Sequence, residues 1–168
     1  KEKRKGTEIP FTEPSTCPEC KGKVVRDDTE VYLRCHNPFC QAQVKRRIQY
    51  FAGRDAMDIE GLGPALVEQL VDKGFVKDYA DIYYLRYEDL ITLERMGEKS
   101  SSNLIHAIEA GKHRDMDRLI CALGILNVGS HTAEVLAERF DTLDKLANTT
   151  QEELEGIYEI GPVVAKSI

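Results

Sequence analysis

Residues 56–70 read AMDIEGLGPALVEQL, and the pattern of this stretch recurs three more times along the chain. It consists of apolar residues three apart, a turn that ends in apolar-Gly and begins with Gly in the first copy, a small residue four positions after this second glycine, and an apolar residue three further on. The second glycines stand at positions 63, 97, 129 and 161, at spacings of 34, 32 and 32 residues. Four copies in one register are much harder to reach by chance than a single Gly-x-Gly, so the repeat decides the fold class.

Each copy predicts two helices joined by a tight hairpin. We expect the second glycine to adopt a backbone conformation that other residues avoid, or to allow a ligand to approach closely. The helix that follows begins with N–H groups that have no partner inside the helix, and these amides and the helix dipole can hold an anion without a charged side chain. A phosphodiester is the expected ligand. The alternative is a structural helical repeat in which the glycine only allows a tight turn between two helices.

The copies differ at the position of the first glycine, which holds in turn Gly61, Arg95, Asn127 and Glu159. Asn tolerates positive φ more readily than Arg or Glu, and a glutamate would also repel a nearby phosphate. Pro64 and Pro162 suit a helix start but remove one donor from the first and fourth copies. Unequal use of the four copies is therefore expected. The residues predicted to contact nucleic acid are Gly61, Gly63, Gly97, Lys99, Ser100, Gly129, Ser130, His131 and Gly161.

A second motif precedes the repeats: the cysteines Cys17-x2-Cys20 and Cys35-x4-Cys40, with 14 residues between the two pairs. Two short pairs joined by a modest spacer suit one tetrahedral Zn²⁺ with four thiolate ligands. Two disulfides are the alternative. No signal peptide precedes the cysteines and the composition is that of a cytosolic protein, which argues against disulfides. We therefore expect one structural zinc ion, with His36 at the surface rather than among the ligands.

The residues around the cysteines predict a β-hairpin and a short helix. Residues 23–26 and 30–33 have strand character, with a turn at 27–28. An amphipathic helix is expected over residues 44–52, with a basic cluster at 45–47 on one side. Such a cluster is usually a solvated face, and a phosphate contact is the other interpretation.

The formal net charge of −6 is unfavourable for binding nucleic acid, but it is unevenly distributed. Residues 1–56 carry a net charge of +4 and residues 57–168 a net charge of −10. DNA binding by the second part must therefore rest on backbone amides and a few placed cations. No apolar run approaches the roughly 20 residues that span a bilayer. The fifth cysteine, Cys121, lies in an apolar run and is expected in the core rather than at a reactive site.

Together these features predict a mainly α protein in three parts. Residues 1–16 are a linker, residues 17–43 a four-cysteine zinc finger with a β-hairpin, and residues 44–168 an all-α domain of four helix-hairpin-helix repeats, the last of them truncated. The chain contains no Lys-x-Asp-Gly motif of nucleotidyl transfer, no Gly-x-x-x-x-Gly-Lys-[Ser/Thr] phosphate loop and no complete dinucleotide fingerprint. We therefore expect a chain that binds and has no catalytic residues.

The zinc motif, the basic helix and the four hairpins, in this order, resemble the C-terminal half of bacterial NAD-dependent DNA ligases. The resemblance runs from about residue 9 to the last residue. It rests on short sequence strings that identify the family in combination, although none of them would do so alone. Tyr50 stands where the family often has His. The strings are Cys17-Pro-x-Cys20, Cys35-x-Asn37-x-x-Cys40, Gln41-Ala42-Gln43, Phe51, Arg54, Ala56-Met57, Ile59-Glu60-Gly61-Leu62-Gly63, Gly97-Glu98-Lys99-Ser100, Ala122-Leu123-Gly124-Ile125, Val128-Gly129 and Ile160-Gly161.

The resemblance implies a fragment of a longer protein of the bacterial cytoplasm. An adenylation domain and an OB-fold would precede it, with residues 1–16 as the linker from that OB-fold, and a BRCT domain would follow. The parent would seal nicks in DNA replication and repair, with NAD as AMP donor and Mg²⁺, neither of which this fragment would bind. The fragment would hold double-stranded, nicked DNA as a monomer, gripping phosphates of both strands without reading sequence.

Three other interpretations remain open at this point. The chain could be a DNA-structure-binding module of a repair or recombination protein that is not a ligase, or a zinc-stabilised helical interaction domain. A base-excision glycosylase also uses such a hairpin, but it would need a catalytic Lys or Asp soon after the hairpin and often a Cys-rich iron–sulfur loop, which are not found here.

Overall fold

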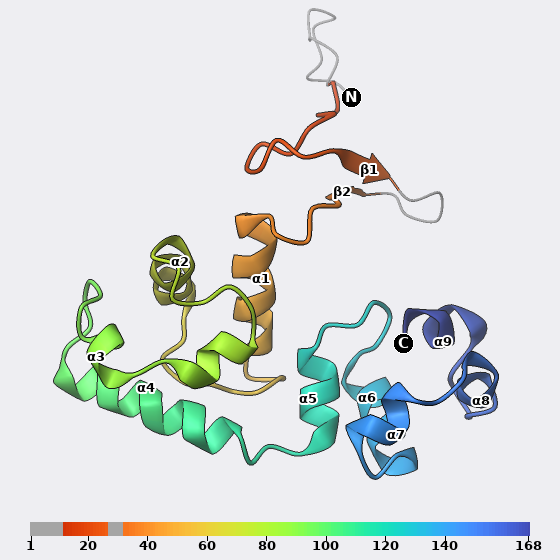
Figure 1. The fold of residues 1–168 in the computed structure, drawn as a ribbon. Coiled ribbons are helices and arrows are strands. Elements are labelled where there is room, and N and C mark those ends of the chain that lie inside the picture. Colours follow the sequence, from red (N-terminus) through yellow and green to blue (C-terminus); the bar gives the residue numbers. More distant parts are fainter. Residues whose placement is uncertain (1–11, 27–31) are drawn as a thin grey trace, which may run out of the picture. The chain divides into compact units, whose positions relative to one another are not determined.

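The computed structural model describes residues 12–26 and 32–168, and the chain divides into two compact units that meet between Gln43 and Val44 (Figure 1). The first unit carries a two-stranded sheet and the second is built from helices. The prediction of a mainly α protein with a small β-hairpin module is therefore confirmed. No helix in the described part of the chain is long and apolar enough to cross a bilayer.

In the first unit, β1 (Val24–Arg26) pairs antiparallel with β2 (Leu33–Cys35), so that Val24 lies opposite Cys35. The described second strand runs from Leu33 into Cys35, so the register of the sheet itself positions a predicted metal ligand; residues 30 and 31 of the expected strand lie outside the described residues. The expected turn at 27–28 lies outside the described residues. On the N-terminal side, Thr16 bridges Lys23 and the N–H of Val24 donates to the carbonyl of Ser15 at 3.2 Å.

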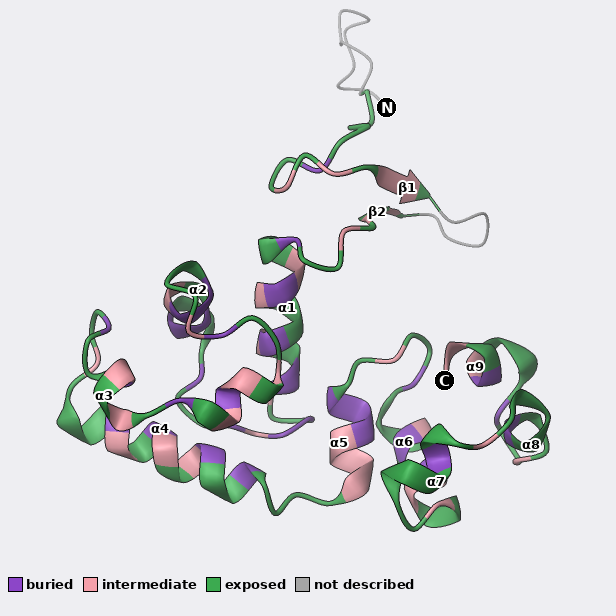
Figure 2. Cartoon of the chain, in the orientation of Figure 1, coloured by how far each residue is buried: buried purple, intermediate pink, exposed green. Residues whose placement is uncertain are grey.

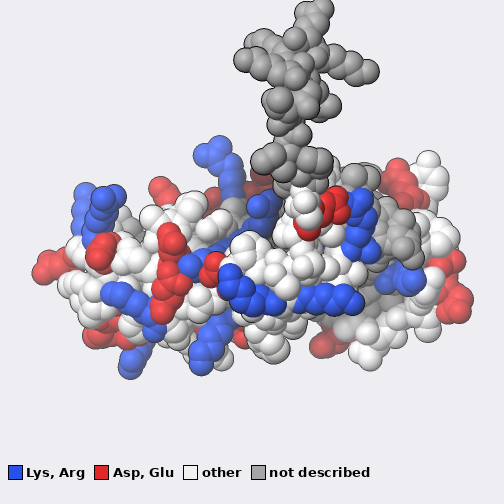
Figure 3. Space-filling view, turned by 90° about the horizontal axis from the view of Figure 1, so that it is seen from above, with Lys and Arg blue, Asp and Glu red and all other residues white. Residues whose placement is uncertain are grey.

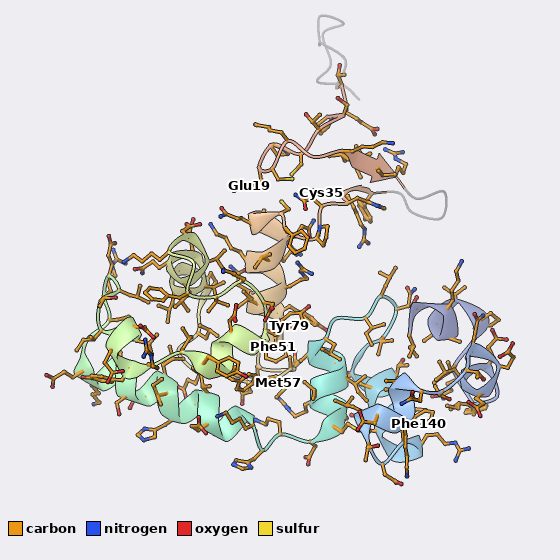
Figure 4. All side chains as sticks on the ribbon, in the orientation of Figure 1. Glu19, Cys35, Phe51, Met57, Tyr79 and Phe140 are labelled. Atoms are coloured by element: carbon orange, nitrogen blue, oxygen red, sulfur yellow. The ribbon has the colours of Figure 1, made fainter. Side chains whose placement is uncertain are left out.

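Helix α1 (Gln41–Phe51) begins directly after Cys40, three residues earlier than the sequence pattern indicated. Its buried residues Val44, Ile48 and Phe51 recur at helical spacing and belong to a hydrophobic core of the second unit. The ring of Phe51 stacks on Tyr79 with centroids 4.9 Å apart (Figure 4). Lys45 does not lie on a free basic face, because its ammonium pairs with Asp72 at 2.7 Å.

The four repeat copies are hairpin 1 (residues 56–70), hairpin 2 (90–104), hairpin 3 (122–136) and hairpin 4 (154–168). Hairpins 1 and 2 share one hydrophobic core with α1, and hairpins 3 and 4 share a second. The helices of the first pair, with the 3-10 helix η1, are α2 (Pro64–Asp72), η1 (Ala80–Tyr84), α3 (Tyr87–Leu90) and α4 (Glu98–Gly111). Those of the second pair are α5 (Met116–Ala122), α6 (Ser130–Arg139), α7 (Leu143–Ala147), α8 (Gln151–Glu155) and α9 (Pro162–Ser167).

Hairpin 1 departs from the expected pair of helices, because residues 53–57 form turns rather than a regular first helix. The small residue of the repeat is nevertheless buried in every hairpin, including hairpin 1. The small residue four positions after each second glycine is buried, with Val67, Ser101 and Ala133 at 0% exposure and Ala165 at 3%. Figure 2 shows buried and exposed residues alternating along the helices. The small side chain therefore lets the second helix of each hairpin pack closely.

Candidate zinc centre and nucleic-acid interface

The four predicted zinc ligands converge in the first unit. The Sγ atoms of Cys17, Cys20, Cys35 and Cys40 all lie within 4.8 Å of one another, with Cys17 to Cys40 at 3.9 Å and Cys20 to Cys35 at 3.5 Å. A tetrahedral Zn²⁺ with bonds of about 2.3 Å holds its sulfurs roughly 3.8 Å apart, so the spacing fits. All four thiols are free, which disagrees with the two-disulfide alternative. His36 is exposed and is not part of the cluster.

The first cysteine turn contains a residue with positive φ. Lys21, with φ of 58°, is the residue in the left-handed region, and it brings its N–H to the carbonyl of Cys17 at 3.0 Å. Gly22 is required for space, because a Cβ there would lie 3.2 Å from the sulfur of Cys20. Hydrogen bonds from the backbone of Gly22 and the side chain of Asn37 lower the pKa of the Cys20 thiol to about 6, whereas burial and the neighbouring thiols of Cys20 and Cys17 raise the pKa of Cys35 to about 12. A metal binds the thiolate, so Cys20 is the readily ionised member of this pair.

The second cysteine turn is organised by Asn37, a residue to which the sequence analysis assigned no role. Its side-chain oxygen accepts the N–H of Phe39 at 3.0 Å, and its carbonyl accepts the N–H of Cys40 at 3.1 Å. Asn favours such turns, so its place two residues after a ligand cysteine is a local signal that could have been recognised. The turn brings Cys40 back to the cluster, where it is almost fully buried.

The four hairpin turns share one backbone geometry. This geometry corrects the expectation that the second glycine adopts a conformation that other residues avoid. The residues in the left-handed region occupy the first glycine position, with φ of 91° at Gly61, 62° at Arg95, 63° at Asn127 and 72° at Glu159. The second glycines are extended residues directly before the helices, with φ between −80° and −119°. Any residue adopts that conformation, so the second glycine is not required by its backbone angles.

Packing within the chain does not require the second glycines either. All four are exposed, and a Cβ on Gly63, Gly97, Gly129 or Gly161 would meet no described atom within 4 Å. The open space beside each second glycine is consistent with the expected close approach of a ligand to the backbone.

The helix starts present their first N–H groups beside these glycines. The carbonyl of each second glycine accepts the first intrahelical bond, from Ser101, Ala133 and Ala165 at 2.9 Å and from Val67 at 3.0 Å. The N–H groups that precede this bond have no i−4 acceptor inside the helix, although in hairpin 1 the N–H of Leu66 also donates to the carbonyl of Gly63 at 3.1 Å. Lys99, Ser130 and His131, three of the residues predicted to contact nucleic acid, lie exposed in this first turn.

Ser100 is engaged within its own hairpin. Its hydroxyl accepts the N–H of Gly97 at 2.9 Å and donates to the carbonyl of Gly97 at 3.1 Å. An anion that used the N–H of Gly97 would therefore have to replace the hydroxyl. Ser100 and Gly61 also meet along a cavity of about 470 Å³, together with Glu60, Asn103 and His106. Hairpins 1 and 2 thus bring two of the predicted residues together at one depression.

Hydrogen bonds between hairpins connect each pair, and the sequence patterns did not indicate them. In the first pair, Gln69 of α2 accepts the N–H of Glu94 at 2.8 Å and donates to its carbonyl at 3.2 Å. In the second pair, the side chain of Asn127 donates to Ser167 of α9 at 3.3 Å. Such contacts hold the turn of one hairpin against the last helix of its neighbour.

His131 and Glu159 also pair across the second tandem, at 2.6 Å between Nε2 and Oε2. The hydrogen bond to Glu159 is the main cause of a raised pKa for His131, and Glu134 adds to it. From the sequence, Glu159 is expected to repel a phosphate and His131 to donate to one. The structure joins the two, so the acidic turn of hairpin 4 is balanced by the cation of hairpin 3 whenever His131 is protonated.

Comparison with known proteins agrees with this arrangement. Residues 16–42 match the family described as NAD-dependent DNA ligase C4 zinc finger domain. Residues 53–110 match a SAM-like helix-hairpin-helix tandem, and residues 118–168 match a helix-hairpin-helix motif. The chain is 54% identical over 165 residues to a DNA ligase of Syntrophus aciditrophicus (strain SB), an alignment that spans 98% of this chain. This chain belongs to the NAD-dependent DNA ligase family.

Other relatives in this ligase family lead to the same conclusion. The chain is 53% identical over 169 residues to a DNA ligase of Halothermothrix orenii and 48% identical over 167 residues to one of Geobacter sulfurreducens. It spans about 25% of the length of each of these relatives. The two helix-hairpin-helix matches coincide with the two hydrophobic cores, so the four repeats of this ligase chain form two tandems. The zinc-finger match and the cysteine cluster together support a structural zinc ion.

Proposed function

We propose that this chain is the part of an NAD-dependent DNA ligase that holds nicked duplex DNA, and that it does so without reading sequence. The helix starts at hairpins 1 to 4 bind phosphates through backbone N–H groups. The observation that carries the proposal is the row of four exposed glycines beside these helix starts, each with open space where a Cβ would stand. A phosphate approaching the backbone fills that space, and no side chain of the described residues does.

Electrostatics favour amides over a basic surface. Residues 57–168 carry a net charge of −10, and Figure 3 shows basic and acidic side chains interspersed on the face that it draws. Helix-start amides attract phosphate without a net positive charge. Lys99 is a placed cation beside Gly97, Ser130 adds a donor beside Gly129, and His131 binds a phosphate there in exchange for Glu159. Hairpins 1 and 4 offer fewer donors, because Pro64 and Pro162 have no N–H.

The zinc ion is proposed to be held by Cys17, Cys20, Cys35 and Cys40 and to act structurally. The ion cross-links the two cysteine turns and β2, elements too small to bury a core of their own. All four ligand positions are filled by thiolates, so no position is left open for a substrate or a reactive water. Cys121 takes no part, because it is buried in the second core beside the hydroxyl of Tyr50.

The ligation chemistry belongs, in this proposal, to other parts of a longer polypeptide of the bacterial cytoplasm. Adenylation by NAD with Mg²⁺ needs a lysine nucleophile in a Lys-x-Asp-Gly motif, which is not in this sequence. The adenylation, OB-fold and BRCT domains are proposed as neighbours in the same chain. This segment contributes affinity and orientation for the duplex as a monomer, and the parent seals the nick.

Binding of a fluorescently labelled nicked duplex tests the proposal. Gly97→Val and Gly129→Val place a branched side chain where the phosphate would lie, and each should weaken binding at least tenfold, equally on unrelated sequences. Gly156→Ala is the matched control, because Gly156 is an exposed glycine with an ordinary φ of −73° at the end of α8. The proposal fails if both valine variants keep their circular dichroism spectrum and bind the duplex as tightly as the control.

A further inference from the structure

The first tandem (hairpins 1 and 2) and the second tandem (hairpins 3 and 4) are built on separate hydrophobic cores, and helix α5 contributes to both. Ala122 is a buried member of the first core and Leu119 packs against it, whereas Ile120 and Cys121 are buried in the second core. Figure 1 shows α5 between α1 and the helices of the second tandem. Apolar packing across this junction is therefore carried by few side chains, and it fixes the orientation of the two tandems only weakly.

A polar contact adds to this junction, and it comes from Arg118 in α5. The Nε atom of Arg118 donates to the carbonyl of Ala56 at 2.8 Å, and its Nη2 atom donates to the carbonyl of Arg54. Residues 53–57 form turns rather than a helix, so their carbonyls need partners outside a helical hydrogen-bond ladder. A guanidinium group presents its N–H donors in a fixed fork, which suits two carbonyls of one turn. The half-buried Arg118 thus fastens α5 to the irregular part of hairpin 1.

Two further contacts join the same parts of the chain. The guanidinium of Arg114 pairs at 2.9 Å with Asp58, a residue held at a positive φ of 50°. The hydroxyl of Tyr50 in α1 lies 3.6 Å from the Sγ atom of Cys121, and a Cβ on Gly124 would lie 3.5 Å from the ring of Tyr50. All of these contacts connect the end of α1 and the turns after it with α5 and its flanking residues. Together with Arg118 they restrict the rotation of one tandem against the other.

We propose that Arg118 is a positioning residue, which fixes the orientation of the two tandems so that both bind one duplex at the same time. The fixed orientation is a property of the free chain, and its use in holding DNA rests on the proposed function. Two sites held in matching geometry bind a ligand that spans both of them more tightly than either site does alone, and a loose connection between the sites forfeits part of this gain. Arg118 acts through this geometry rather than through a phosphate, because its guanidinium group already binds the two carbonyls.

Residual dipolar couplings of the zinc-loaded chain test the fixed orientation without DNA. In the parent chain, one alignment tensor should describe the backbone N–H vectors of both tandems. Arg118→Met keeps an unbranched apolar side chain but removes the donors, and it should require a separate tensor for each tandem while both tandems stay folded. Arg139→Met is the matched control and should still fit one tensor, because Arg139 is an exposed arginine in the last turn of α6. A parent chain that needs two tensors, or Arg118→Met that still fits one, overturns the proposal.

The length of the duplex separates positioning from folding and from charge. Nicked duplexes of about 10 to 30 base pairs, or roughly one to three helical turns, are titrated with each variant. Arg118→Met should bind the longest duplex roughly tenfold more weakly than the parent chain and the shortest duplex equally well, because a short duplex reaches one tandem only. A loss of the same size on the shortest duplex would overturn the positioning role.

Arg118→Lys separates the fork of the guanidinium group from its charge. Lysine keeps the charge without the planar fork, so this variant should behave like Arg118→Met on every duplex. Full recovery of binding by lysine would assign Arg118 to a direct phosphate contact and overturn the proposal. If the parent chain binds no duplex at all, the proposed function fails, whereas the dipolar couplings still decide whether Arg118 fixes the two tandems.

Discussion

His131 at the start of α6 and Glu159 in the turn before α9 are joined by a 2.6 Å hydrogen bond, although they lie 28 residues apart in the chain. Glu159 occupies the left-handed position of hairpin 4, so the bond ties a strained turn to the helix start of its partner hairpin. This pairing makes the second tandem sensitive to pH in a way that the first tandem, joined by Gln69 and the backbone of Glu94, is not.

The His131–Glu159 pair predicts a pH-dependent stability difference. Glu159 raises the pKa of His131 in the folded chain, so the stabilisation is fully present below the unfolded pKa of about 6.5 and is lost as pH rises through the folded pKa. Glu159→Gln should therefore lower the melting temperature at pH 5.5 and leave it unchanged at pH 9. Proton NMR should show the pKa of His131 falling in Glu159→Gln and falling less in Glu134→Gln. An unchanged pKa in Glu159→Gln would contradict the assignment.

The cysteine cluster predicts that zinc and the first unit are lost together. Cys17→Ser should reduce the zinc content, measured by elemental analysis, from one ion per chain to nearly none, because the metal supplies most of the folding free energy of such a module. The helical circular dichroism signal should survive, because both hydrophobic cores consist of residues from Val44 onward. Cys121→Ser is the control and should keep its zinc; a loss of metal there would refute the ligand set.

Replacing either of two adjacent serines, Ser100 or Ser101, by alanine should change the stability of the protein in opposite directions. The hydroxyl of Ser101 is fully buried and has no hydrogen-bond partner among the described residues, and hairpins 3 and 4 carry Ala133 and Ala165 at this position. Ser101→Ala should raise the free energy of unfolding by about 1 kcal/mol, or the melting temperature by roughly 2–4 °C. Ser100→Ala should lower the free energy of unfolding by about 1 kcal/mol, because it removes the cap on Gly97. Thermal melts of the two variants that shift in the same direction would contradict this account.

Removing the charge of Lys99 should change the salt dependence of DNA binding. If its ammonium neutralises one phosphate, Lys99→Ala should weaken binding to every sequence and reduce the slope of log K against log salt by about one unit. Lys145→Ala is the control, because Lys145 lies in α7 and pairs with Asp141 at 2.5 Å. Titrations at four or more salt concentrations check the slope, and equal slopes for the two variants would remove Lys99 from the interface.

The sequence alone was enough to predict the mainly α class, the four hairpins in register and the set of four cysteines. These features are local, because a helix period, a Gly-x-Gly turn and a pair of nearby cysteines each leave their signature within a few residues. The same locality explains why the small residues at 67, 101, 133 and 165 are all buried. Their position relative to the second glycine follows from helix geometry within one hairpin.

Tertiary structure decided which turn position adopts positive φ, which hairpins share a core and which side chains remain exposed. Arg95 and Glu159 adopt positive φ although their residue types disfavour it, because the packing of each hairpin imposes the turn. The pairing of His131 with Glu159 and of Gln69 with Glu94 joins residues that are distant in the chain, and such contacts depend on how two hairpins share one core. No local pattern encodes that shared core, because it exists only after both hairpins have folded against each other.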